Sequence, residues 1–330
     1  MNGLSELFST PRDRFAELRA ALLCRRLRRS AAQAGVALVY HRVGGDHSGD
    51  ASREILPALS GPAFAKHVRH LKRHYRLVPA SGLVDAVRSR RRGEPFPACV
   101  TFDDDLAGHV RETLPILRQE GVTATFFVGG VSLDGPHAFW WQDLQTVIDN
   151  RLLDALPHIA VADLRPALER EPKAIFRVAA AIESLEPQQR AETAAALRAA
   201  AGGTVDEGLE GADMARLLAA GCDIGFHTLR HEALPQLDDD ALEAALRDGR
   251  DRLETVTGRR LALVSYPHGK ADERVAGAAR TAGYDAGFTT GRSAVNAETD
   301  PLLVPRIPPA LAPGKTALRI ARAVASCTSR

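Results

Sequence analysis

Three short polar motifs contain the residue types that hydrolytic chemistry needs. The first is a run of acids, Asp103-Asp104-Asp105, which directly follows an apolar segment at 98–102. Adjacent carboxylates repel one another and are costly to bury together unless a cation or a shared proton relieves them. One carboxylate of the run is therefore a candidate metal ligand, and its neighbour is a candidate to reach the bound water. The same acids would also suit the N-terminus of a following helix, where negative charge is favourable.

The second motif pairs His227 with His231. We expect a helical turn here, in which side chains four residues apart lie on one face and are close enough to share an ion. Together with Asp104, the two imidazoles would form a two-histidine, one-carboxylate set with open positions for water and substrate. Such a set suits zinc or another first-row divalent metal. Two surface histidines without a common role would give the same pattern.

The third motif is SYPHG at 265–269, at the end of an apolar segment. A Pro-X-Gly turn after a strand can direct a backbone N–H into a site, although an ordinary surface turn has the same composition. All three motifs lie at the ends of predicted strands. Loops at the C-terminal ends of parallel strands are where α/β folds place their sites.

The elements that must position these motifs alternate along the chain. Short apolar runs predict strands at 36–40, 98–102, 122–128, 222–226, 261–266, 286–289 and 302–307. Helical periodicity predicts helices at 61–75, 81–92, 109–119, 212–220, 238–257 and 271–282. This alternation indicates a parallel α/β sheet or barrel. Residues 131–210 break the rhythm and are interpreted as a helical insertion.

Composition excludes several classes of protein. The 330 residues are 45% hydrophobic and 25% charged, which excludes a disordered or fibrous chain. The 43 basic and 41 acidic residues nearly cancel, so we expect no nucleic acid partner. The four cysteines are far apart, which argues against a disulfide framework and a cysteine zinc site. We expect no transmembrane helix and no signal peptide, and therefore a cytoplasmic location.

Residues 1–30 are expected to form an N-terminal basic helix outside a barrel domain at 31–330. Phe15, Leu18, Leu22 and Leu23 share one side of the helical stretch at 12–30, and arginines cluster at its end. A solvated helix packed on the domain explains this pattern. Peripheral contact with anionic lipid at the inner face of a membrane is the sharper alternative.

Taken together, the motifs TFDDD, HTLRH and YPHG resemble those of the NodB-like polysaccharide deacetylases, carbohydrate esterase family 4. Their order matches, as does ATFFV shortly after the first motif, and the resemblance covers roughly 36–130 and 211–310. It implies an α/β fold of the distorted (β/α) barrel type, here with a helical insertion. It also implies one divalent metal ion and the removal of N-acetyl or O-acetyl groups from sugars. Zinc is the expected ion, with cobalt, nickel, manganese and iron as alternatives.

The resemblance also implies roles for individual residues. Asp103 corresponds to the general base of the family. Asp104, His227 and His231 correspond to its metal ligands. The backbone N–H of His268 corresponds to the group that stabilises the oxyanion.

The chain departs from the family pattern at several positions. Asp105 stands where the family usually has glycine, and His268 stands where it has an aromatic residue before the glycine. Ala262 and Ser265 occupy the positions of arginines, one of which orients the base in the family. The late Leu-x-x-His motif that supplies the general acid is absent.

One branch of the family suggests how these losses are compensated. LVYHRV at 38–43 resembles the first strand of deacetylases that act on poly-N-acetylglucosamine, and this implies His41 as the general acid. A packed or surface histidine is the alternative. Arg306 lies in the apolar segment at 302–307, and a buried arginine needs a carboxylate partner. We expect it to orient Asp103 in place of the missing arginine, with a surface arginine as the alternative.

These interpretations predict a metal-dependent hydrolase that removes N-acetyl groups from a sugar of a glycan or a glycan precursor. The expected partner is therefore an N-acetylated sugar or glycan. An O-acetyl ester or another amide is an alternative substrate on the same scaffold. A catalytically inactive protein for glycan binding or assembly is an alternative of a different class.

Overall fold

The computed structural model describes residues 10–44, 54–134, 139–152, 171, 174–203 and 208–328. They fall into two compact units. The larger unit takes its residues from Met1–Gly44, Leu59–Leu133 and Leu209–Arg330, and the smaller unit takes its residues from Gly45–Ala58 and Asp134–Gly208.

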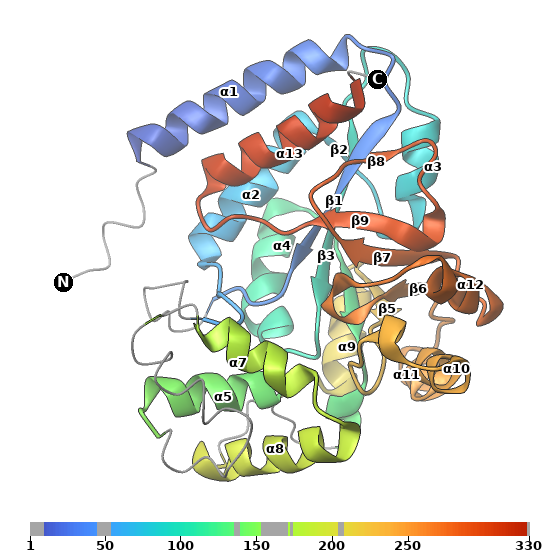
Figure 1. Cartoon of the computed structure of the whole chain (residues 1–330). Coiled ribbons are helices and arrows are strands. Elements are labelled where there is room, and N and C mark those ends of the chain that lie inside the picture. The colour runs from blue at the N-terminus through green and yellow to red at the C-terminus, as the bar shows by residue number, and fades with distance from the viewer. Residues whose placement is uncertain are drawn as a thin grey trace. The chain divides into compact units, whose positions relative to one another are not determined.

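The larger unit contains a closed barrel of seven parallel strands (Figure 1). Strand β1 (Ala34–Tyr40) pairs with β3 (Pro97–Asp103) on one side and with β9 (Val304–Ile307) on the other, which closes the ring. Between β3 and β9 lie, in order, β4 (Thr125–Val128), β5 (Asp223–Phe226), β6 (Leu263–Ser265) and β7 (Ala286–Thr290). The predicted (β/α) barrel is confirmed.

Two short strands that the sequence did not predict extend this ring. Strand β2 (Arg76–Leu77) pairs in parallel with the start of β3, and β8 (Val295–Asn296) pairs antiparallel with the start of β1. Both join the barrel at the N-terminal ends of their partners. They therefore leave the opposite strand ends, where the motifs lie, unobstructed by further pairing.

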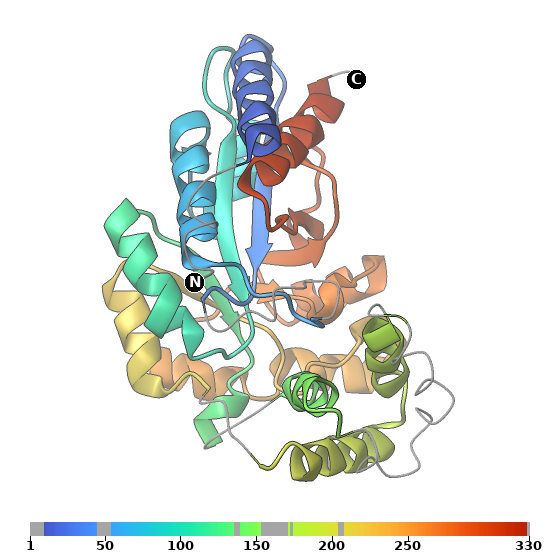
Figure 2. The same cartoon turned by 90° about the vertical axis from the view of Figure 1, so that its left-hand side faces the viewer.

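Helices cover the outer surface of the barrel. Helix α1 (Pro11–Arg28) packs along α13 (Pro313–Thr328), and both contact α2 (Gly61–His74), as Figures 1 and 2 show. The basic helix is therefore part of the larger unit and not a separate N-terminal unit. The other α-helices of this unit are α3 (Leu83–Arg88), α4 (Leu114–Glu120), α9 (Gly211–Ala219), α10 (Asp239–Arg247), α11 (Arg250–Thr257) and α12 (Glu273–Thr281).

Helix α13 had no counterpart among the predicted elements, and one predicted helix is interrupted. The expected helix at 238–257 is divided into α10 and α11 because Gly249 adopts a left-handed conformation with φ of 82°. Among the described helices, none combines the length and the apolar character needed to cross a membrane.

The smaller unit is helical and has its own apolar core. Its helices are α5 (Trp140–Asp149), α7 (Ala174–Glu183) and α8 (Pro187–Ala200), packed around Leu144, Val147, Val178, Ile182 and Leu197. Its longer segment, Asp134–Gly208, nearly coincides in sequence with the expected insertion at 131–210. Residues 54–58, which the prediction left in the barrel, also belong to this unit: the Ile55 N–H donates to Gln145 Oε1 at 3.0 Å.

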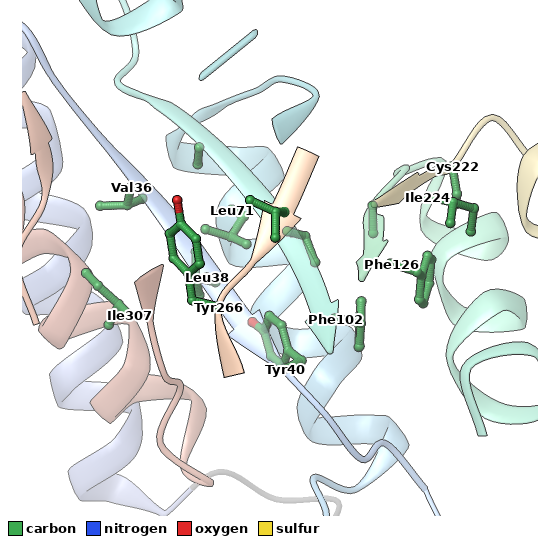
Figure 3. Close-up of a cluster of buried hydrophobic side chains, with 14 of the residues drawn as sticks. Val36, Leu38, Tyr40, Leu71, Phe102, Phe126, Cys222, Ile224, Tyr266 and Ile307 are labelled. Atoms are coloured by element: carbon green, nitrogen blue, oxygen red, sulfur yellow. The ribbon is translucent and has the colours of Figure 1, made fainter. Parts of the chain in front are cut away.

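Alternation along the barrel strands separates an outer layer from an inner one. Phe102 points outward, where its ring stacks on Phe126 at 4.9 Å and on Tyr40 at 5.4 Å between centroids (Figure 3). Its neighbours Thr101 and Asp103 point into the barrel, because successive side chains of a strand lie on opposite faces. The aromatic outer layer thus fixes which residues of β3 reach the interior.

A glycine gives the interior room for a phenylalanine ring. A Cβ atom on Gly225 would lie 2.5 Å from two ring carbons of Phe127, a separation that no real contact allows. Gly225→Ala should therefore lower the free energy of unfolding by about 1–3 kcal/mol, as overpacking typically does. Urea denaturation measures the change.

Gly277→Ala is the control for this prediction. Gly277 lies in α12, and a Cβ there would have no heavy atom within 4 Å. Alanine should stabilise this helix by about 0.5–1 kcal/mol. If both variants shift stability in the same direction, the packing argument for Gly225 is wrong.

Candidate active site

The three motifs meet at the C-terminal ends of the barrel strands. Asp104 directly follows β3, His227 directly follows β5, and Ser265 is the last residue of β6. Arg306 lies in β9 and His41 directly follows β1. Residues from five strands, far apart in the sequence, are therefore brought to one end of the barrel.

Asp104, His227 and His231 form a set of three converging donors. The Nε2 atom of His227 lies 3.6 Å from Asp104 Oδ1, and the Nε2 atom of His231 lies 3.7 Å from the same oxygen. Ligands about 2.0–2.2 Å from a tetrahedral ion lie about 3.4 Å from one another. The spacing of these donors therefore fits a first-row divalent ion between them.

The environment of Asp104 supports the same conclusion. Its Oδ1 atom is buried and has no hydrogen-bond partner among the described residues. Burial raises the pKa of Asp104 well above its ordinary value, and the charges of Asp103 and Asp105 add to that shift. A buried carboxylate oxygen that lacks a donor and faces two imidazole nitrogens needs a cation to be stable in its charged form. The residues present thus fit a metal ion.

The sequence predicts a helical turn for His227 and His231, and this prediction is wrong. The segment after β5 is irregular, and Thr228 and His231 both have left-handed backbones, with φ of 58° and 51°. This double reversal brings the rings to 5.0 Å between centroids in an edge-to-face arrangement. The pairing of His227 with His231 is therefore present, but a strained loop produces it.

The ring of His227 is held in one orientation. Its Nδ1 atom lies 2.8 Å from the backbone carbonyl of Ser265, so Nδ1–H donates there and Nε2 keeps its lone pair towards Asp104. Such a second hydrogen bond fixes the tautomer of a ligating histidine. Burial lowers the pKa of His227, while the nearby Asp103 opposes that shift. The neutral imidazole is the form that binds metal.

Arg306 is fully buried in the barrel and forms a bidentate pair with Asp103. Its Nη1 and Nη2 atoms lie 2.6 Å and 2.7 Å from the two carboxylate oxygens. The remaining donors reach Thr101 Oγ1 at 3.1 Å, Ser265 Oγ at 2.6 Å and the carbonyl of Thr289 at 3.2 Å. All five N–H donors of the guanidinium are thereby satisfied. The expected contact between Arg306 and Asp103 is present.

This pair decides the charge state of Asp103. Burial raises the pKa of its carboxyl, but the charge of Arg306, with those of His227 and His41 and the hydrogen bonds of the guanidinium, holds that pKa well below the usual range. Asp103 is therefore ionised at any physiological pH. Ser265, which stands where the family has an arginine, bridges the pair, since it also contacts Asp103 Oδ2 at 3.2 Å.

His41 also lies close to Asp103. Its Nε2 atom is 4.0 Å from Asp103 Oδ2, the same distance that separates this oxygen from His227 Nε2. About a third of the His41 side chain is exposed. Burial of the ring lowers the pKa of His41 to about 4, against the opposing effect of Asp103, so the imidazole is neutral at pH 7. It is thus a proton acceptor in the free protein.

The turn after β6 carries His268 next to His231, one of the candidate metal ligands. His268 has a left-handed backbone with φ of 58°, and its ring packs edge-to-face on His231 at 4.7 Å between centroids. Gly269 follows with φ of 65°, and a Cβ there would lie 2.2 Å from the Thr290 side chain. Only glycine fits this turn. The assignment of the His268 N–H as an oxyanion donor stays a prediction.

Asp105 has a structural role that the sequence did not reveal. Its carboxylate accepts hydrogen bonds from the backbone N–H groups of Gly129, Gly130 and Ser132 and from the Ser132 hydroxyl, at 2.6–3.3 Å. It therefore ties the segment after β4 to the loop that follows β3. The Gly-Gly pair after a predicted strand was the available signal for such a cradle of N–H groups.

His109 is a second residue that sequence reasoning missed. It is buried, and its Nε2 atom lies 3.0 Å from the backbone carbonyls of both Asp103 and Asp104. Nε2–H donates to this pair and so supports the left-handed Asp104, whose φ is 74°. A histidine at the start of a predicted helix gave no signal for this contact.

Comparisons with known proteins bear on this geometry. Residues 183–287 match the family model described as polysaccharide deacetylase. The resemblance to the polysaccharide deacetylase family is thereby confirmed. The matched range contains the second and third motifs of the deacetylase pattern, whereas Asp103, His41 and Arg306 lie outside it. A comparison with curated sequences gives no significant match.

Solved structures of several deacetylases share the fold of this chain. The Streptococcus pyogenes deacetylase PplD in complex with acetate is 15% identical, with a TM-score of 0.58, and the match covers 88% of this chain and 98% of that one. IcaB from Ammonifex degensii is 17% identical with a TM-score of 0.54, covering 88% and 97%. The BpsB deacetylase domain from Bordetella bronchiseptica is 12% identical with a TM-score of 0.51, covering 84% and 96%.

The buried pair generates a stability prediction. Arg306→Ala leaves Asp103 charged and unpaired inside the barrel, and should lower the free energy of unfolding by about 3–5 kcal/mol. Replacing both residues, as Asp103→Leu with Arg306→Met, should cost less than the single change, because no buried charge is stranded. Urea denaturation of both variants measures the difference.

Arg247→Ala is the control, because its ion pair with Glu243 is exposed and should be worth at most about 1 kcal/mol. If the double variant is as unstable as Arg306→Ala, the loss comes from packing, and the electrostatic interpretation of the pair is wrong.

Proposed function

We propose that this protein is a metal-dependent hydrolase that removes N-acetyl groups from a sugar of a glycan or glycan precursor. One observation carries the proposal: the donor set of Asp104, His227 and His231 lies directly beside an Asp103 that Arg306 keeps ionised. A buried cation site next to a positioned base is the arrangement that hydrolysis of an acyl bond requires. The match to the polysaccharide deacetylase model supports a sugar-linked acetyl group as the substrate.

Asp104, His227 and His231 would hold the ion. A divalent ion bound by this set polarises an acetyl carbonyl and lowers the pKa of a bound water towards 7. Zinc suits two imidazoles and one carboxylate, and cobalt, nickel, manganese and iron accept the same donors. Proton transfer is assigned to two side chains that are not ligands, Asp103 and His41.

Asp103 and His41 transfer one proton from the attacking water to the sugar nitrogen. Both begin the cycle without a proton, because Arg306 keeps Asp103 ionised and burial keeps His41 neutral. Asp103 takes a proton from the attacking water, while the water oxygen forms a bond to the acetyl carbon. The proton then reaches the sugar nitrogen through His41 as the C–N bond breaks. Acetic acid, which releases its proton to solvent as acetate, and the free amine leave, and the pair returns to its starting state.

The turn at His268 would stabilise the transition state. Its backbone N–H, on the side of the site next to His231, is the candidate donor to the oxyanion that develops on the carbonyl oxygen. One such donor is typically worth about 3 kcal/mol. The turn is held in place because Gly269 fits closely against Thr290.

Two alternatives remain distinct from this proposal. An O-acetyl ester would be cleaved by the same groups, because the polarised carbonyl is common to esters and amides. An inactive glycan-binding protein would have no need for a buried, unpaired carboxylate oxygen on Asp104, which costs stability unless an ion is bound. The second alternative is therefore the weaker of the two.

The proposal predicts acetate release that depends on Asp103. With N-acetylglucosamine oligomers as substrate, Asp103→Asn should lower kcat by about 10²–10⁴-fold, the usual contribution of a general base. The bound metal should remain, because Asp103 is not one of its ligands. Acetate release and metal content of the same preparations check both points.

His227→Ala is the matched control, since it should lose metal and activity together. Acetate release by Asp103→Asn at the wild-type rate would contradict the assignment of the base. A wild-type protein that binds metal but releases acetate only from O-acetyl sugars would select the ester alternative.

The role of His41 predicts a dependence on the leaving group. His41→Ala should lower turnover of an N-acetyl sugar by about 10²–10⁴-fold, because the amine must be protonated to leave. The same variant should hydrolyse 4-nitrophenyl acetate nearly as fast as the wild type, since nitrophenolate leaves without a proton. Steady-state kinetics on both substrates, with His74→Ala as control, measures the contrast. Equal losses on both substrates would show that His41 is not the acid.

A further inference from the structure

The outward face of α1 is apolar, although the helix lies on the surface of the larger unit. Phe15, Leu18 and Leu22 have exposed fractions of 61%, 57% and 57%. The opposite side of the helix is buried through Ala20, Cys24 and Leu27, and α1 packs along α13 (Figure 2). Burial of the inner face therefore accounts for the fold of α1 and leaves its exposed apolar residues without a structural role.

Arginines border the apolar stripe on both sides. At about 100° per residue, Phe15, Leu18 and Leu22 fall within about 60° of one another on the helix. One flank carries Arg12, Arg19 and Arg26, and the other carries Arg14, Arg25 and Arg28. Among the described residues, none of these arginines forms an ion pair with a carboxylate. We call the apolar stripe and its two flanking rows of arginines the α1 face.

A basic groove adjoins the α1 face. It lies between α1 and α2 and has a volume of about 420 Å³. Arg14 and Leu18 line it from α1, and Lys66, Arg69 and Arg73 line it from α2, with the imidazoles of His70 and His74 between them. Glu17 is the one carboxylate among its described lining residues. Because Arg14 and Leu18 belong to both features, the groove and the α1 face form one continuous surface.

We propose that the α1 face and this groove bind the surface of a membrane that contains anionic phospholipid. A helix that lies in the interface buries an apolar stripe in the headgroup region, while flanking cations contact lipid phosphates. The long arginine side chains can keep their charges at the phosphates while their stems cover apolar surface. A solvated helix would place polar residues where Phe15, Leu18 and Leu22 stand. The concentration of positive charge around the stripe favours an anionic bilayer over a neutral partner.

Vesicle sedimentation of the full chain tests the proposal. The chain should bind vesicles of phosphatidylcholine with phosphatidylglycerol at least about tenfold more tightly than vesicles of phosphatidylcholine alone. Binding should weaken as salt rises, because exposed charges are screened. Equal binding to the two vesicle types, or no binding to either, would overturn the proposal.

Two variants separate the apolar and the charged contributions. Replacing Phe15, Leu18 and Leu22 by serine should weaken binding to the anionic vesicles at least about tenfold, because the apolar insertion is lost. Replacing Arg12, Arg19 and Arg26 by glutamine should weaken it and reduce its dependence on salt. Circular dichroism checks that each variant folds. We expect folding to be retained, because the replaced side chains are exposed.

Leu311→Ser is the matched control, because Leu311 is 46% exposed in the same unit but lies outside the α1 face. It should bind vesicles like the wild type, and all variants should hydrolyse a soluble substrate at the wild-type rate. Unchanged vesicle binding by the serine variant would refute the role of the stripe. If that variant instead dissociates a dimer and the wild type ignores vesicles, the face is an interface between two copies and the proposal is wrong.

Discussion

The ion pair between Arg306 and Asp103 is the interaction on which the site depends. It joins β9 to β3 across the interior of the barrel, at 2.6 Å and 2.7 Å. A buried arginine is tolerated only when its hydrogen bonds are satisfied, and here all five donors have acceptors. The pair therefore requires a closed barrel, because two strands from distant parts of the chain supply its charges. The site is therefore complete only when β9 closes the barrel.

The charges around the pair favour a cation at this end of the barrel. Arg306 neutralises Asp103, and Asp105 is stabilised by three backbone N–H groups and one hydroxyl. Of the three acids, Asp104 alone has a buried oxygen with no donor among the described residues, and the neighbouring acids raise its pKa further. Two imidazoles, with Nε2 atoms 3.6–3.7 Å away, face that oxygen. A divalent ion would satisfy the carboxylate and both nitrogens together.

Sequence reasoning found the barrel and the candidate residues but not the local geometry that joins them. The alternation of strands and helices, with acids and histidines at strand ends, was sufficient to predict that Asp104, His227 and His231 lie close together. The left-handed conformation of His231 was not predictable, because even histidine, which adopts positive φ more often than most residues, does so only uncommonly. Likewise, the support from His109 depends on a tertiary contact with two carbonyls. The contact of Arg306 with Asp103 was accessible because a charged residue inside an apolar strand needs a partner.

The most direct test of this account is X-ray absorption spectroscopy of the zinc-loaded wild-type protein. The account predicts one zinc per chain with two imidazole nitrogens and one carboxylate oxygen at about 2.0–2.2 Å. It further predicts loss of one imidazole in His231→Ala and an unchanged spectrum in Asp103→Asn. A zinc ion without imidazole ligands, or a spectrum that changes on removal of the Asp103 carboxylate but not of His231, would contradict the division of roles between the adjacent acids.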